Sequence, residues 1–238
     1  MPVSQPHSMP RLADHVRACR IGDQMIFLDL LRSKYVGIGG PQLQALSEIL
    51  LGEIPADRPS NSAPIDDWIR RLTAQQLLSD TPDAGTQRPS QLPEPVASLD
   101  TDDERGDRSD KRQLLRLWRA TWVTSAWLRP RSLAHIADRV IALRARHSNR
   151  DRQLDAEATR AAVGAYVRLR PFALTTHERC LNDSLALVHF LAGQGLFPQW
   201  VIGVRVRPFC AHSWVQSSGV VLNDVPERVR GYRPILVV

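Results

Sequence analysis

Residues 175–191 read TTHERCLNDSLALVHFL, and this stretch decides the fold of the C-terminal half of the chain. Its apolar residues recur at spacings of three and four, which is typical of the buried face of a helix: Leu181, Leu185, Val188 and Leu191. Thr175 or Thr176 could cap this helix, so that Cys180 would lie in its first turns. Backbone N–H groups at a helix N-terminus favour a thiolate, the nucleophilic form of cysteine. The stretch therefore predicts a core helix with a reactive cysteine near its start.

The sequence after this helix predicts strands. Residues 199–207 read QWVIGVRVR, in which large apolar side chains alternate with others as they do in a strand. Residues 211–224 read AHSWVQSSGVVLND and predict a hairpin whose three-residue loop is centred on Ser218. In that register His212 lies directly opposite Asp224, with both side chains on one face of the sheet. Because a slip of one residue would place them on opposite faces, this register is a specific prediction.

Cys180, His212 and Asp224 together predict a catalytic triad. Their order along the chain is that of papain-like enzymes, in which the histidine and its orienting partner follow the nucleophile. Asp224 would fix the tautomer of the His212 imidazole, and the second ring nitrogen would serve Cys180 as base. The backbone N–H of Cys180 would be the first donor to an oxyanion, and the residues do not indicate the second.

Residues 1–80 predict a small α+β domain with a winged-helix-like arrangement. Strands are expected over 16–20, 24–30 and 34–38, with a turn at Gly22-Asp23 between the first two. Two helices should follow, because apolar residues recur at helical spacing in two runs: Leu43, Leu46, Ile49 and Leu50, then Ile65, Trp68, Ile69 and Leu72.

Composition changes again after residue 80. Residues 81–110 are rich in Pro, Asp, Ser and Arg and predict a flexible linker. Residues 111–238 form the second predicted domain, which begins with helices. Two helical stripes are expected, and a third, weaker helix over about 155–168: the stripes are Leu114, Leu117, Trp118 and Trp122, then Leu133, Ile136, Val140 and Leu143. Trp118, Trp122 and Trp127 are expected in the core.

Charge and cysteine content narrow the class of protein. The net charge of +6 suits an acidic peptide or nucleic acid as partner. DNA binding is disfavoured, because the helix expected around Leu43–Leu51 carries no Lys or Arg. The three cysteines are widely spaced, which argues against disulfides and points to a reducing cytosol. We expect neither a metal site nor a nucleotide or other cofactor site, and no signal peptide or membrane span.

Several short motifs of the C-terminal part resemble one family. They are Arg179-Cys180-Leu181, Ser184-Leu185-Ala186-Leu187, Val201-Ile202-Gly203-Val204, Pro208-Phe209, Ala211-His212-Ser213-Trp214-Val215 and Leu222-Asn223-Asp224. Together they resemble the maturation protease of lasso-peptide biosynthesis, the "B" protein, a transglutaminase-like cysteine peptidase. Residues 1–80 resemble its small precursor-recognition domain, which in some members is a separate protein. The sequence departs from the family pattern at Asp183, Cys210 and Gln216.

The resemblance implies a function and partners. The peptidase would remove the leader from a ribosomally made lasso precursor, with Cys180 as nucleophile, His212 as base and Asp224 as orienting residue. An asparagine-synthetase-like cyclase would then close the macrolactam with ATP. The recognition domain would bind the leader as an added β-strand. We expect that peptide site at the strand and helix that contain these residues: Lys34, Tyr35, Val36, Leu43, Leu46 and Leu50.

Two other functions fit the same residues. An acyltransferase or transglutaminase would use the same triad and pass the acyl group to an amine instead of water. A non-catalytic peptide escort would have lost activity in its C-terminal domain, against which the complete triad argues. The mass of the product separates hydrolysis from transfer, and a Cys180→Ala variant separates catalysis from escort.

Overall fold

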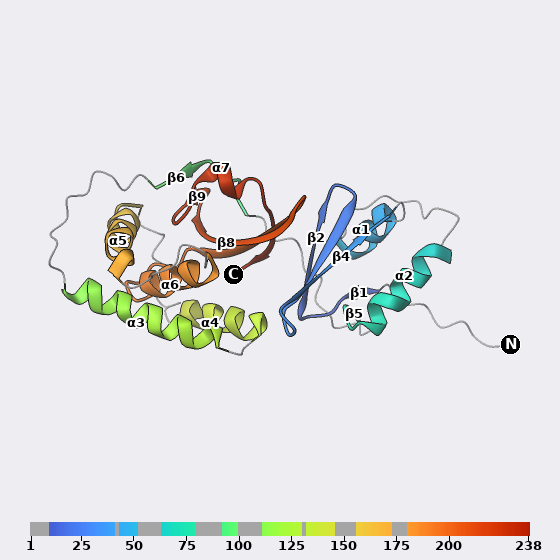
Figure 1. Ribbon diagram of the computed structural model, residues 1–238, viewed down its shortest axis with the longest axis horizontal. Coiled ribbons are helices and arrows are strands. Elements are labelled where there is room, and N and C mark those ends of the chain that lie inside the picture. The colour runs from blue at the N-terminus through green and yellow to red at the C-terminus, as the bar shows by residue number, and fades with distance from the viewer. Residues whose placement is uncertain are drawn as a thin grey trace. The chain divides into compact units, whose positions relative to one another are not determined.

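The computed structural model describes eight segments of the chain: residues 10–40, 43–51, 63–79, 92–99, 111–129, 132–145, 156–172 and 180–238. The chain divides into two compact units, Met1–Ser90 and Gln91–Val238 (Figure 1). Along the described residues, no helix combines the length and the apolar character needed to cross a bilayer.

The first unit is built on a three-stranded antiparallel sheet with strand order β2-β3-β4. Its strands are β2 (Val16–Ile21), β3 (Gln24–Asp29) and β4 (Lys34–Gly39). Gly22 adopts a φ of 57° in the first turn, a conformation that glycine accepts at little cost. Two helices, α1 (Leu43–Leu51) and α2 (Ala63–Ala74), follow the sheet, and β1 (Arg11–Leu12) pairs with β5 (Leu78–Ser79). The strands and helices expected for this region are present.

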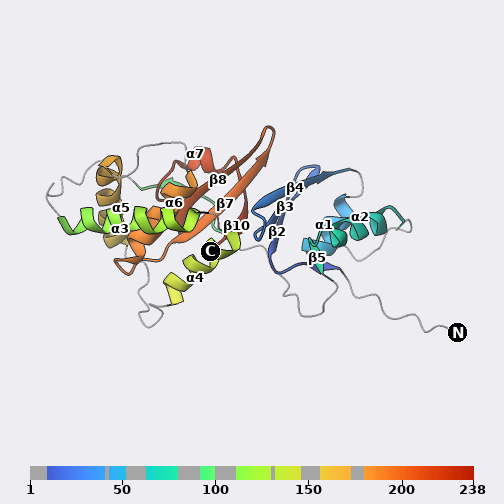
Figure 2. The same ribbon diagram turned by 60° about the horizontal axis from the view of Figure 1, so that its bottom comes forward.

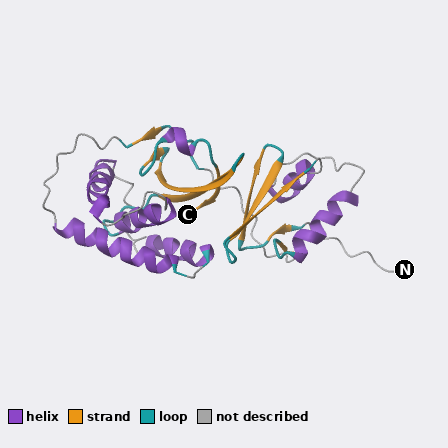
Figure 3. Cartoon of the chain, viewed as in Figure 1, coloured by secondary structure: helices purple, strands orange, loops and turns teal. Residues whose placement is uncertain are grey.

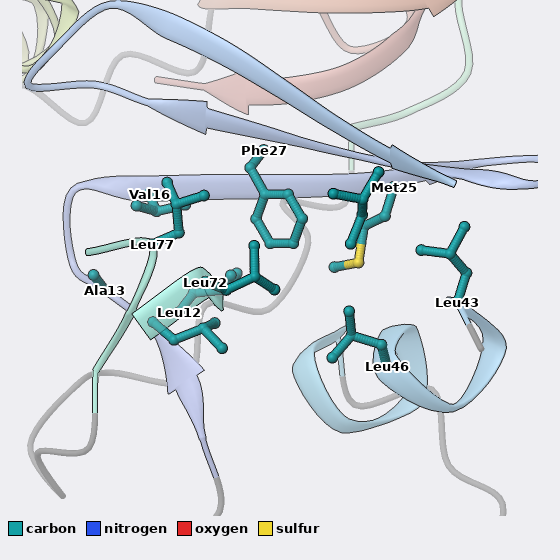
Figure 4. Packing of buried hydrophobic residues seen from close by; sticks show 11 residues of the cluster. Leu12, Ala13, Val16, Met25, Phe27, Leu43, Leu46, Leu72 and Leu77 are labelled. Carbon is teal, nitrogen blue, oxygen red and sulfur yellow. The ribbon is translucent and has the colours of Figure 1, made fainter. Parts of the chain in front are cut away.

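The core of the first unit lies between its sheet and its helices (Figure 3). Met25 and Phe27 of β3 are fully buried and face Leu43 and Leu46 of α1 (Figure 4). Leu72 of α2 closes the same cluster. Burial of side chains of this size contributes about 1.5–3 kcal/mol each.

The second unit contains a five-stranded sheet with strand order β10-β7-β8-β9-β6. Its strands are β6 (Ala97–Ser98), β7 (Gln199–Val206), β8 (Phe209–Ser217), β9 (Val220–Val221) and β10 (Arg233–Val237). The helices are α3 (Lys111–Leu128), α4 (Leu133–Ala145), α5 (Ala156–Leu169), α6 (Cys180–Ala192) and α7 (Pro226–Val229), with a 3-10 turn at Arg170–Phe172.

Helix α6 is the centre of the second unit. It contacts β8 on one side and α3, α4 and α5 on others (Figure 2). Every residue of α6 from Ser184 to Ala192 is buried. The predicted core helix is therefore present, and it begins at Cys180. The caps proposed at Thr175 and Thr176 lie outside the described residues.

The buried face of α3 differs from the predicted stripe. Trp118 and Trp122 are 48% and 78% exposed, so the prediction that both are core residues was wrong. Trp127 is buried as expected, and the inward face is otherwise made of smaller residues: Leu117, Ala120, Thr121 and Thr124. The hydroxyls of Thr121 and Thr124 donate to the carbonyls of Leu117 and Ala120, at 2.8 Å in each case. Because these bonds satisfy both hydroxyls, threonine can occupy the inward face and a tryptophan stripe can point outward.

The hairpin between β8 and β9 is one residue out of the predicted register. Gln216 pairs with Val221 and Ser217 with Val220, so the loop contains two residues, Ser218 and Gly219. Their φ angles are 48° and 85°. Two successive left-handed residues are what a tight two-residue hairpin loop requires. The three-residue loop was therefore a wrong prediction.

Part of the stretch interpreted as a linker joins the sheet of the second unit. Strand β6 pairs in parallel with β9, through Ala97 to Val220 and Ser98 to Val221. The N–H of Val96 donates to Gly219 O at 2.9 Å. Residues 81–91 and 100–110 lie outside the described part of the chain.

Candidate active site

Cys180, His212 and Asp224 lie together in the second unit. Cys180 is the first residue of α6, and His212 lies on β8 opposite Gly203 of β7. Asp224 lies between β9 and α7, and its Oδ2 is 2.5 Å from Nε2 of His212. The His212 side chain lies close enough to the Cys180 thiol to lower its pKa. Because Nε2 is occupied by Asp224, the ring nitrogen that faces Cys180 is Nδ1.

Asp224 reaches His212 although the predicted register was wrong. Strand pairing ends at Val221, and the N–H of Leu222 still donates to Val215 O at 2.9 Å. The N–H of Val215 then donates to Oδ1 of Asn223 at 2.8 Å, so a side chain takes the place of a strand carbonyl. The chain leaves the sheet at this point, and Asp224 turns back to the imidazole.

The environment of Cys180 favours the thiolate. Burial alone would raise the pKa of the thiol, but hydrogen bonds from His212 and from the backbone at Ser213 and Leu181 outweigh it, and the pKa falls below the ordinary 9.0. The positive end of α6 acts in the same direction.

The environment of His212 favours the imidazolium. Burial would lower its pKa, but the bond to Asp224 and the neighbouring Cys180 raise that pKa to about 9. Asp224 stays ionised, because bonds from His212 and from the N–H of Val225 outweigh burial and lower its pKa. Between the pKa values of Cys180 and His212, the site therefore holds a thiolate–imidazolium ion pair.

A second set of polar contacts ties the Asp224 segment to α6. Nδ2 of Asn223 donates to Oδ2 of Asp183 at 2.9 Å, and the hydroxyl of Tyr166 donates to Oδ1 of Asp183 at 3.0 Å. Arg170 lies 3.5 Å from the same carboxylate. Asp183 is one helical turn after Cys180, so this carboxylate joins the helix that begins at Cys180 to the segment that carries Asp224. We name Tyr166, Asp183 and Asn223 the amide clamp.

The amide clamp was not predicted as part of the site. Asp183 was noted only as a departure from the family pattern. The available signal was its spacing from Cys180 on one helix, together with an amide directly before Asp224.

Behind the triad lies a buried polar cluster. Nε1 of Trp200 donates to Oγ of both Ser184 and Ser213, at 3.1 and 2.8 Å. The two hydroxyl oxygens are 2.7 Å apart. All three side chains are at most 3% exposed, and each polar atom has a partner. This cluster ties α6, which begins at Cys180, to β7 and to β8, which carries His212.

Two aromatic rings enclose His212. The ring of Trp214 stacks at 6.1 Å between centroids, and the ring of Tyr232 lies at 5.1 Å. Gly203 makes this packing possible, because a Cβ there would lie 2.7 Å from the Trp214 ring and 2.9 Å from Tyr232 Cβ. The role of Tyr232 was missed, since no sequence pattern links it to His212 and only the packing of the fold brings their rings together.

We expect Gly203→Ala to destabilise the second unit by about 1–3 kcal/mol, as overpacking of a buried site does. The Trp214 ring is buried against its neighbours and has no room to move away. Urea unfolding followed by tryptophan fluorescence would measure this loss. Gly193→Ala is the control, because its nearest contact, to Phe190 O, is a tolerable 3.4 Å. Equal stability of the two variants would contradict the packing argument.

The residues expected to bind the leader are divided between the surface and the core of the first unit. Strand β4, with Lys34, Tyr35 and Val36, is an edge of the described sheet, as a strand-addition site requires. Leu43 and Leu46 are only 7% and 3% exposed and pack against β3, which leaves them little surface for a peptide. Leu50 of α1 is half-buried beside the same core.

Within the described segments, no group of three His, Cys, Asp or Glu side chains is placed to hold a metal ion. Cys210 lies two residues before His212 on β8. The hydroxyl of Tyr232 donates to its Sγ at 3.7 Å, so this thiol contacts the aromatic surroundings of the site.

Comparison with known proteins places the triad in a recognised kind of domain. A 47-residue stretch is 47% identical to the microcin J25-processing protein McjB of Escherichia coli, which is 20% of this chain and 23% of that protein. The alignment thus spans under a quarter of the relative's length. No solved structure gave a significant match. Residues 120–237, which include Cys180, His212 and Asp224, match the family model of the transglutaminase-like superfamily. The second unit therefore contains a transglutaminase-like domain.

Proposed function

We propose that this protein is a cysteine peptidase that removes the leader from a ribosomally made lasso precursor peptide. The observation that carries the proposal is the Cys180–His212–Asp224 arrangement, with a thiol pKa lowered and an imidazole pKa raised. The similarity to a protein named for processing microcin J25 supports the substrate class.

The proposed reaction is hydrolysis of one peptide bond through a thioester. The Cys180 thiolate attacks the last carbonyl of the leader, and the backbone N–H of Cys180, at the start of α6, donates to the oxyanion. His212 protonates the departing amine of the core peptide while Asp224 holds the ring. The neutral imidazole then removes a proton from water, which releases the leader as a free acid.

The first unit would hold the leader while the second cuts. We propose residues 1–80 as the recognition domain, residues 81–110 as the connection and residues 111–238 as the peptidase. The leader would pair with β4, whose outer edge has no neighbour in the described sheet. Main-chain bonds to that edge would provide affinity, and Lys34, Tyr35 and Val36 would contact leader side chains.

The decisive experiment measures the intact mass of the cognate precursor after incubation with the wild type or with a cysteine variant. The wild type should make a single cut, and Cys180→Ala should make none. Cys19→Ala, which removes a cysteine of the first unit, is the matched control and should cut like the wild type. If neither wild type nor control cut the precursor when the cyclase and ATP are also supplied, the peptidase proposal would be wrong.

Acyl transfer is the second candidate, because the transglutaminase-like match admits an amine as acceptor. The same mass experiment separates the two reactions. Hydrolysis leaves the leader with a free carboxylate, whereas transfer leaves it joined to the added amine. Acylation of Cys180 releases the core with a free amine in both reactions, so only the fate of the leader carbonyl separates them.

A further inference from the structure

Arg205 and Tyr232 form a stacked pair next to His212. The guanidinium carbon of Arg205 lies 5.2 Å from the centroid of the Tyr232 ring, and that ring lies 5.1 Å from the His212 ring. Arg205 is two residues after Gly203 on β7, so both positions share a face of the sheet. His212, Tyr232 and Arg205 therefore form a row of neighbouring side chains that ends at the exposed Arg205.

The charge of Arg205 is exposed and has no ion-pair partner in the described part of the chain. Its side chain lies at the surface, and among the described residues it forms no ion pair. A guanidinium that stacks on a ring loses little further freedom when it binds, and its N–H groups stay available at the edge. Such a group suits a planar carboxylate, which accepts two parallel hydrogen bonds.

Tyr232 lies close to the reacting thiol as well. Burial, the contact with Cys210 and the negative charge of Cys180 all raise the pKa of its phenol. Tyr232, on which Arg205 stacks, is therefore within electrostatic range of the Cys180 sulfur. In an extended peptide, successive residues advance about 3.3–3.6 Å, so a side chain within about three residues of the cut can reach Arg205.

We propose that Arg205, held by Tyr232, is a specificity-determining residue that binds a carboxylate side chain of the substrate near the scissile bond. The substrate class is then a peptide with Asp or Glu close to the cut. The inference rests on the proposed function only for the peptide nature of the substrate. The carboxylate site itself is tested without any peptide.

The first test compares iodoacetate with iodoacetamide as alkylating agents. In both reactions the Cys180 sulfur displaces iodide from carbon, and only iodoacetate carries a carboxylate. The ratio of the two rate constants at Cys180, followed by mass after digestion, reports attraction of a carboxylate to the site. Arg205→Gln should lower this ratio about threefold to tenfold at low salt, the effect of one nearby unit charge in water.

Matched variants separate charge from stacking. Arg160→Gln removes an exposed arginine from α5 and should leave the ratio unchanged. Tyr232→Phe keeps the ring and should retain the ratio, whereas Tyr232→Leu should lower it. A ratio in Arg205→Gln equal to that of the wild type would overturn the proposal.

The second test uses the cognate precursor. Each acidic residue within three positions of the cut is changed to Lys, and kcat/KM is measured with the wild type and with Arg205→Glu. One Lys substitution should weaken cleavage by the wild type and be restored by Arg205→Glu. If the wild type cleaves the precursor but Arg205→Glu rescues none of the Lys variants, Arg205 is not the specificity residue. The proposed peptidase activity would not be affected by that result. Absence of cleavage by the wild type would count against the peptidase, and the alkylation ratio would still decide the carboxylate site.

Discussion

His212→Ala is expected to lower kcat for precursor cleavage by about 10²–10⁴-fold, the usual contribution of general acid–base catalysis. The same substitution should change the reactivity of Cys180. In the wild type, the bond from His212 is the main influence that opposes burial and lowers the pKa of the thiol. Without it, burial is less opposed and that pKa should rise toward the ordinary 9.0 or above.

The pH dependence of alkylation by iodoacetamide measures this change. In the wild type, the rate at Cys180 should rise to a first plateau below pH 9, where the thiolate is paired with imidazolium. It should change again near pH 9, where His212 loses its proton. In His212→Ala the first plateau should disappear. His135→Ala, on α4, is the control, and an identical profile in all three proteins would show that no ion pair forms.

Asn223→Asp is expected to destabilise the second unit by about 1–3 kcal/mol at pH 7. The substitution keeps the shape of the side chain, but it replaces an N–H donor with a carboxylate oxygen that faces Asp183 Oδ2 at about the 2.9 Å of the present bond. Two half-buried carboxylates at this distance repel each other, so the folded state raises the pKa of the pair.

The sign of the pH effect follows from linkage. The raised pKa means that the folded protein holds a proton which the unfolded chain releases near pH 4, so stability is lost as pH rises above that value. Urea unfolding at pH 4.5 and pH 7 should therefore show partial recovery in acid. Asn223→Ala removes the bonds of the amide clamp without repulsion, and its loss should not recover. If both variants responded alike to acid, the repulsion argument would fail.

Local patterns were sufficient to predict most of the elements. Strand β7 alternates large apolar residues, β3 carries a run of four, and α6 carries an uninterrupted apolar face, so neighbouring residues were enough to predict the type of these elements. The hairpin register depended on Ser218 adopting a left-handed conformation, which nothing in its residue type requires. The His212–Asp224 pair was nevertheless found, because the amide of Asn223 replaces a backbone partner and brings the chain back.

Features that depend on distant partners could not be predicted from the sequence. Tyr232 reaches His212 only through tertiary packing, and the same packing brings Asp183 and Asn223 of the amide clamp together. On α3, the face with Trp118 and Trp122 is more apolar than the face that is buried, so the sequence favoured the wrong face. Thr121 and Thr124 can lie on the buried face because their hydroxyls donate to carbonyls of the same helix. Strand β6 is only two residues long and exposed, so its own sequence does not indicate a strand. It is a strand because it pairs with β9, which lies more than a hundred residues later in the chain.

The pairing of β6 with β9 limits where the chain could be divided into two separately encoded proteins. Gln216 is fully buried, and its amide donates to Pro93 O at 2.6 Å while its oxygen accepts from Trp214. A polypeptide that began at Lys111 would leave this amide unpaired and the edge of β9 open to pairing with another molecule. Gene fission would therefore have to fall before residue 92, so that strand β6 stays in the same polypeptide as the rest of the second unit.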